Sequence, residues 1–180
     1  MRKVLYLLGE LNDDDVEWLI ANGTRQAVPA GAVIIEEGKA AGALYIVLDG
    51  TLSATVAALG GEEVERLICG AVVGEMSFVD GRPPSATVRA REHAVVLVIP
   101  LPRLAAKLQQ DMGFAARFYK AIAIFLSDRL RGKVQMLSGR QAPQLDEDVV
   151  DEDELDPVLL DTMYLAGTRF DRMLKRLVSA

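Results

Sequence analysis

The feature that most restricts the fold of this chain is a change of hydrophobic period along it. Between residues 25 and 100, short apolar or alternating runs are separated by turns that carry glycine. Such runs are typical of β-strands. Many short strands at this spacing indicate a β-sandwich or barrel. The runs cover residues 32–35, 43–48, 52–57, 64–68, 86–90 and 94–99.

Two dipeptides predict how these strands are connected. Asp49-Gly50 lies between two of the runs and is a strong signal for a two-residue hairpin. Gly60-Gly61 is a weaker signal of the same kind. We therefore expect the strands to pair largely with their neighbours in the sequence.

Helical patterns flank the predicted barrel on both sides. Asn12 is suited to cap a helix whose first turn is acidic, and Gly23 is expected to end it. After residue 100, Pro102 fits the first turn of a short helix, and Gly113 is expected to separate it from a long helix over residues 114–137. The predicted organisation is a helical lead (1–24), a barrel (25–100), paired helices (101–139), an acidic linker (140–156) and a final amphipathic helix (157–180).

The long helix is unusually apolar. Its stripe is wider than a helix lying singly on a barrel requires, which predicts that part of it forms a dimer interface. The alternative is that the stripe packs wholly within one chain. The residues assigned to the dimer interface are Phe118, Ile122, Phe125 and Leu126.

The segment 74–90 has the features of an anion-binding cradle. Gly74 and Gly81 bound a short apolar segment, and Pro83-Pro84 precede a Ser-Ala pair that opens a β-branched strand. Backbone N–H groups that converge in this way bind phosphate.

Several blocks of the sequence resemble the cyclic-nucleotide-binding domain of the bacterial catabolite activator and of the protein kinase A regulatory subunit. The order of a helix, eight or so strands, a Gly-Glu cassette and two helices is the same, over roughly residues 11–137. The resemblance implies a jelly-roll barrel that carries an N-terminal helix and a dimerising C-terminal helix. The blocks are residues 32–39, 44–50, 74–76 and 85–90.

The resemblance also implies a set of ligand contacts. Glu75 matches the acid that accepts the ribose 2′-hydroxyl, and Gly74 and Met76 match backbone contacts near the sugar and phosphate. Ser85 and Ala86 match the pair whose N–H groups hold the cyclic phosphate. The alternative for Glu75 is a carboxylate that caps local N–H groups at a helix start.

This sequence departs from the family pattern at two places. The family's phosphate-binding arginine directly precedes the Ser-Ala pair, and here that position is Pro84, which has neither charge nor N–H. Arg82 is the nearest substitute, and the alternative is that it is a solvent-facing turn residue. On the long helix, Arg129-Leu130 stand where the activator places hydroxyl residues that contact adenine.

Composition and charge exclude several classes of function. The chain has 180 residues and a net charge of −6, which argues against nonspecific binding to nucleic acid or to an anionic membrane. The single cysteine, Cys69, lies in an apolar run and is expected to be a small core residue. The apolar run at residues 4–8 is too short for a signal peptide, and no run suits a membrane span. A cytoplasmic protein is expected.

Nothing in the sequence indicates an enzyme, a metal site or a bound cofactor. His93 is the only histidine and lies in a polar turn, where we expect it to be exposed. The serines form no nucleophile elbow. The paired acids fall in the acidic run near the C-terminus, where a solvated linker is the simpler interpretation.

Two functions remain open at this stage. The first is a dimeric regulatory domain whose pocket binds cAMP or cGMP weakly, in an altered way or not at all. The second is a ligand-independent scaffold that engages a protein partner through its C-terminal tail. DNA binding is not expected, because the residues after 139 leave room for one helix beside the acidic run, and a recognition module needs at least a helix pair.

Overall fold

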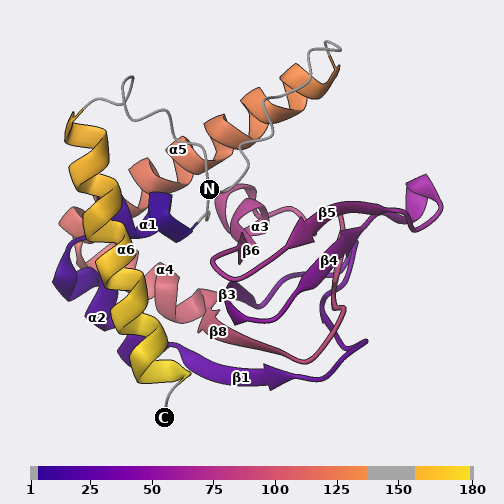
Figure 1. Ribbon diagram of the computed structural model, residues 1–180, viewed down its shortest axis with the longest axis horizontal. Helices are drawn as coiled ribbons and strands as arrows, with labels where there is room; N and C mark the ends of the chain where they lie inside the picture. Colours follow the sequence, from indigo (N-terminus) through magenta and orange to yellow (C-terminus); the bar gives the residue numbers. More distant parts are fainter. Residues whose placement is uncertain (1–3, 138–156, 179–180) are drawn as a thin grey trace.

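The computed structural model describes residues 4–137 and 157–178, and its strands form two four-stranded antiparallel sheets (Figure 1). One sheet has the order β1-β8-β3-β6 and the other the order β2-β7-β4-β5. This arrangement confirms the predicted jelly-roll barrel. The strands are β1 (Thr24–Val28), β2 (Val33–Ile35), β3 (Ala43–Asp49), β4 (Leu52–Thr55), β5 (Glu63–Leu67), β6 (Val72–Val73), β7 (Thr87–Ala90) and β8 (Ala94–Pro100).

The hairpin predicted at Asp49-Gly50 is wrong, because β3 and β4 lie in different sheets. Gly50 has a φ of +78°, and a Cβ at this position would lie 2.5 Å from the carbonyl oxygen of His93. Glycine therefore lets the chain cross between the sheets close to the turn before β8. The weaker signal at Gly60-Gly61 does mark a hairpin, which joins β4 to β5. The expectation that the strands pair largely with their neighbours in the sequence is wrong, because the other pairs, β1–β8, β3–β8, β3–β6, β2–β7 and β4–β7, join strands distant in sequence.

Two hydrophobic cores share the β1-β8-β3-β6 sheet. Along β3, Val47 faces the interior of the barrel, whereas Leu44 and Ile46 face the helices. Strand side chains point alternately to opposite faces, so a strand covered on both sides is apolar throughout. This accounts for the continuous apolar runs of β3 and β8, in contrast to β5, which is mostly exposed.

Apart from a short 3₁₀ turn at the tip of the β4–β5 hairpin, the helices lie on one side of the barrel (Figure 1). The predicted cap of α2 is present, since Asn12 and Asp15 each accept a hydrogen bond from the other's backbone N–H. The break before α5 is at Asp111, which accepts a hydrogen bond from the N–H of Phe114, and Gly113 lies inside the helix. Helix α1 was not predicted. The helices are α1 (Val4–Glu10), α2 (Asp13–Asn22), the 3₁₀ turn η1 (Ala57–Leu59), α3 (Glu75–Asp80), α4 (Leu101–Gln110), α5 (Met112–Leu137) and α6 (Pro157–Leu177).

The core explains the apolar character of α5. Phe118, Ile122 and Phe125 are 0, 4 and 4% exposed and pack within the chain. The prediction that they form the dimer interface is therefore wrong. The core that forms against α1 and α4 takes up Phe118 and Ile122. Leu126 is only partly buried.

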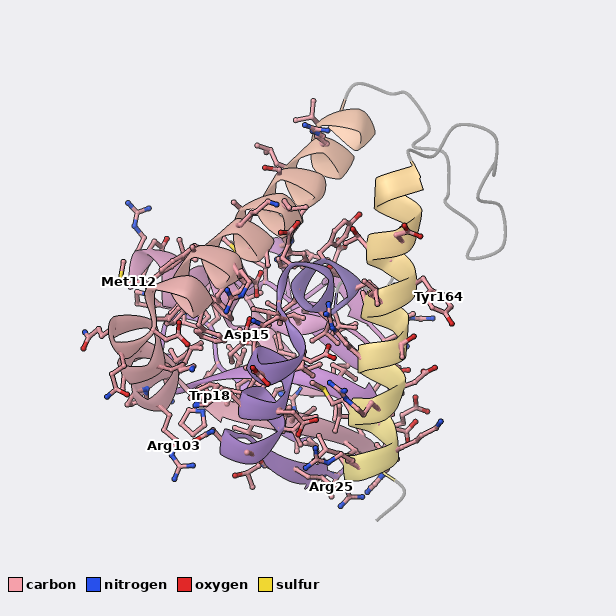
Figure 2. All side chains as sticks on the ribbon, turned by 90° about the vertical axis from the view of Figure 1, so that its left-hand side faces the viewer. Asp15, Trp18, Arg25, Arg103, Met112 and Tyr164 are labelled. Carbon is pink, nitrogen blue, oxygen red and sulfur yellow. The ribbon has the colours of Figure 1, made fainter. Side chains whose placement is uncertain are left out.

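Helix α6 lies along α1 and α2, far from the barrel interior (Figures 1 and 2). Ala166, Phe170 and Met173 on its inner face are almost fully buried. A Cβ at Gly9 of α1 would lie 2.9 Å from the Cγ2 of Thr162, so the missing side chain lets the two helices approach closely. The predicted helix end at Gly139 and the acidic linker 140–156 lie outside the described residues.

Three smaller predictions have clear outcomes. His93 is exposed in the turn before β8, as expected. Cys69 is half-buried, and its thiol donates a hydrogen bond to the carbonyl oxygen of Leu48, 3.1 Å away. Within the described ranges, no helix is both long and apolar enough to cross a membrane.

Candidate functional site

The site begins where β6 ends at Gly74. This residue has a φ of +92°, a left-handed conformation that favours glycine. A Cβ here would lie 2.7 Å from the carbonyl oxygen of Ala43 in β3, so the close approach of the two segments also requires glycine. Helix α3 starts at the next residue, and its first side chain, Glu75, is 2% exposed. The local sequence thus places a carboxylate at the mouth of the barrel.

A small cavity of about 70 Å³ lies beside Glu75. Five of the six residues predicted to contact a ligand line it, namely Gly74, Glu75, Met76, Ser85 and Ala86. Pro84 also lines it, at the position where the family's phosphate-binding arginine is expected. Pockets that hold small-molecule ligands measure ~300–1,000 Å³. The cavity therefore has the expected walls but is much smaller than a nucleotide requires.

Arg82 does not reach this cavity. Its side chain is 83% exposed and lies 3.9 Å from a carboxylate oxygen of Asp80. The backbone N–H of Arg82 also donates to Asp80, which fixes the turn after α3. Pro83-Pro84 then carry the chain to the cavity with the Arg82 side chain directed elsewhere. The prediction that Arg82 substitutes for the missing arginine is not supported by this geometry.

The guanidinium at the cavity comes instead from α5. Arg129 donates from Nη1 to Oε1 of Glu75 at 2.9 Å and from Nη2 to Oε2 of Glu65 at 2.7 Å. Its side chain is 27% exposed, compared with 3% for Glu75 and 23% for Glu65. Charge-assisted hydrogen bonds of this kind are stronger than neutral ones, particularly where burial limits screening. We refer to these three side chains as the Arg129 clamp.

The charges at the cavity do not favour an anion. Two carboxylates, those of Glu65 and Glu75, line it together with the single guanidinium of Arg129. Ser77 and Ser85 add neutral hydroxyl groups. A phosphate would therefore meet an excess of negative charge, which opposes its binding. No cluster of three potential metal ligands occurs among the described residues.

A second contact joins α3 to α5 close to the cavity. The ring of Phe78 in α3 meets Phe118 edge-on, with centroids 5.7 Å apart, and stacks on Tyr119 at 6.3 Å. Figure 1 shows α5 passing over α3 and β6. The first and fourth residues of α3 are thus both anchored to α5, one through charge and the other through aromatic packing.

Sequence reasoning missed the roles of Glu65 and of Arg129 as a charged partner. A signal for Glu65 was present, because it lies two residues before the buried Leu67 and so shares its face of β5. Arg129 was noticed as a departure from the family pattern. Its partners could not be named, since they lie 54 and 64 residues away in the sequence.

Comparisons with known proteins agree with this architecture. The family described as "Cyclic nucleotide-binding domain" matches residues 25–111. A search among curated protein sequences finds no match. Among solved structures, a cyclic nucleotide-binding domain from Methylobacillus flagellatus superposes with a TM-score of 0.68 at 20% identity, covering 79% of this chain and 85% of that one.

Two further solved structures share the fold. The catabolite activator protein of Thermus thermophilus has a TM-score of 0.61 and 24% identity, and the match covers 97% of this chain and 87% of that one. The regulatory subunit of a cAMP-independent protein kinase A from Trypanosoma brucei has a TM-score of 0.55 and 19% identity, with 78% and 43% covered. Identities at this level establish the fold alone. Residues 25–111 match the cyclic nucleotide-binding domain family, and the solved structures show that the shared fold extends beyond this segment.

Proposed function

We propose that this chain is a homodimeric regulatory domain whose pocket has a non-standard phosphate cassette and binds cAMP or cGMP weakly or not at all. The observation that carries the proposal is the identity of the charged groups at the cavity. Pro84 takes the place of the expected arginine, and the guanidinium that is present, Arg129, is bonded to Glu75. Glu75 is the carboxylate that the family uses for the ribose hydroxyl.

The missing arginine has a predictable effect on affinity. A hydrogen bond to a charged group contributes about 1.5–3 kcal/mol. Its loss lowers affinity by roughly ten- to hundredfold. The additional carboxylate of Glu65 opposes a cyclic phosphate further, because it faces the same cavity.

The outer face of α5 supports the homodimer. Tyr119, Leu130 and Val134 are 50, 64 and 55% exposed. Tyr119, Ala123, Leu126 and Leu130 follow one another at intervals of four, three and four residues, as in the apolar seam of a coiled coil. A second copy of α5 is the occupant that this spacing fits. These residues replace Phe118, Ile122 and Phe125 as the proposed interface, and we call them, with Val134, the α5 seam.

Titration calorimetry of the full chain with cAMP and cGMP tests the ligand proposal. We expect at most weak binding by the wild type, without a micromolar midpoint, and an affinity at least about tenfold higher in Pro84→Arg, which restores one charged hydrogen bond. Arg82→Ala is the matched control and is expected to change nothing, because its side chain lies outside the cavity. Micromolar binding by the wild type would contradict the proposal.

A ligand-independent scaffold is the second candidate. Tyr164 and Leu165 on the outer face of α6 are 78 and 51% exposed, and Figure 2 shows Tyr164 directed away from the molecule. Adjacent exposed apolar side chains are a feature of surfaces that engage protein partners. A partner that still binds a Tyr164→Ala, Leu165→Ala variant of the full chain with unchanged affinity would argue against this face as its docking site.

A further inference from the structure

The Arg129 clamp joins segments that the barrel itself does not hold together. Glu65 lies in β5, Glu75 opens α3, and Arg129 lies in the second half of α5. Each carboxylate receives a hydrogen bond from a different nitrogen of the same guanidinium. The Nη1 atom also lies 3.9 Å from the sulfur of Met76, another residue of the cavity wall. The guanidinium is therefore enclosed by groups that line the ligand site.

We propose that the Arg129 guanidinium is the resident occupant of the pocket, where it takes the place of a ligand and holds the outer half of α5 on the barrel. The inference deepens the proposed function, on which it rests for the identity of the pocket. It assigns to Arg129 and Glu65, which lie outside the family cassette, the control of what the pocket accepts.

The burial of Glu75 indicates that Arg129 fills a position in the pocket and is not part of an incidental surface ion pair. An ionised carboxylate removed from water requires a partner, and the Glu75 side chain is 3% exposed. Among the described side chains that line the cavity, Arg129 carries the only positive charge. Its departure would leave Glu65 and Glu75 facing the same space. The vacated position would then suit a cation of guanidinium shape rather than a cyclic phosphate.

The position of Arg129 along α5 gives the clamp a mechanical role. The inner half of α5 is held by the buried aromatic core, and it contacts Phe78 of α3 through Phe118 and Tyr119. Arg129 lies ten residues further along, which is about 15 Å of helix. Leu130, the next residue, belongs to the exposed α5 seam. The occupancy of the pocket and the position of the seam are thus controlled by neighbouring residues of one helix.

Hydrogen exchange of the full chain, without nucleotide, tests this role. Arg129→Ala should accelerate exchange by at least about tenfold in peptides from residues 123–134 of α5 and from the start of α3, because both segments lose a partly buried charged contact. Peptides from the inner half of α5, residues 112–121, should be unchanged. Arg131→Ala is the matched control, since Arg131 is an exposed arginine of the same helix. It should leave exchange at the wild-type rate.

Chemical rescue makes the test specific to the pocket. Ethylguanidinium at non-denaturing millimolar concentration should restore protection in Arg129→Ala, whereas the same concentration of sodium chloride should not. If Arg129→Ala fails to fold, Glu65→Gln is the second variant and should show the same regional loss of protection, to a smaller extent. If the folded variants exchanged at the wild-type rate, the proposal that Arg129 occupies the pocket and holds α5 would be overturned. This outcome would leave the nucleotide titrations unaffected. Tight cAMP binding by the wild type would overturn the proposed function and the exclusion of a ligand by Arg129, whereas the exchange of the variants would still report whether Arg129 holds the outer half of α5.

Discussion

Two helical segments, α6 and the outer half of α5, are attached through arginine–carboxylate pairs, but of these two segments only α6 also buries an apolar face at the point of attachment. On α6, Arg169 and Arg176 pair with Asp13 and Glu17 of α2. These pairs border the buried side chains Ala166, Phe170 and Met173. On the outer half of α5, the Arg129 clamp lies on a cavity, and the neighbouring apolar side chains are exposed.

This difference implies that α6 is attached permanently, whereas the attachment of the outer half of α5 can change. Exposed ion pairs contribute little stability, so α6 is held mainly by the area that it buries. Among the described side chains of α5 beyond Phe125, none is fully buried, and the Arg129 clamp joins this part of the helix to the barrel. A helix held in this way can respond to a change at the pocket, whereas α6 is expected to respond only to partial unfolding.

The largest expected effect comes from removing the buried contact of α6. Phe170 is 1% exposed, and Phe170→Ala should lower the free energy of unfolding by about 3–5 kcal/mol through lost burial and the cavity that remains. Urea denaturation followed by circular dichroism measures the change. Tyr164→Ala, on the exposed face of the same helix, should stay within about 0.5 kcal/mol. Equal effects of the two variants would show that α6 does not bury its inner face in solution.

A smaller effect is expected at the α5 seam. Leu130→Glu places a charge at the centre of the proposed interface and should weaken the dimer by about 2 kcal/mol, or roughly 30-fold in the dissociation constant. Sedimentation equilibrium of the full chain gives this constant. Arg131→Glu introduces the same acid one residue away and off the heptad positions, and should have much less effect. A wild-type chain that sediments as a monomer at tens of micromolar would remove the seam as a dimer interface.

The sequence allowed the barrel to be predicted because period and turn residues are local signals. The runs that became β3 and β8 and the cap at Asn12 needed no knowledge of the rest of the fold. The error at Asp49-Gly50 has a physical cause, since a left-handed glycine suits a hairpin and a crossover between sheets equally well. The choice between a hairpin and a crossover depends on the strands with which β3 and β4 pair, and these lie later in the chain.

The candidate site could be predicted only as far as its walls. Gly74, Glu75 and Ser85 belong to two neighbouring blocks of the family pattern and were found together. The pairing of Glu75 with Arg129 joins a short helix after β6 to the far half of another helix, and no local pattern encodes that contact. The apolar stripe of α5 was likewise detected, but sequence could not separate the residues used by α1, α4 and α6 from those left exposed.

The smallest expected effect is a pH dependence of the α6 attachment. The hydrogen bond from Arg169 lowers the pKa of Asp13 from its usual value, which is about 3.9 in an unfolded chain. Because the folded pKa is the lower one, this pair stabilises the fold above about pH 4 and loses its effect as the pH falls through the folded pKa. Asp13 is largely exposed, so screening limits its contribution to at most about 1 kcal/mol.

Asp13→Asn should therefore be slightly less stable than the wild type at pH 7, and the difference should shrink as the pH is lowered towards 3. Urea denaturation at a series of pH values measures both quantities. Asp161→Asn, at an exposed position of α6, serves as the control for removing one acid. A difference that stayed constant down to pH 3 would mean that the negative charge of Asp13 does not stabilise the fold, and that the burial of Phe170 and its neighbours holds α6 without help from this pair.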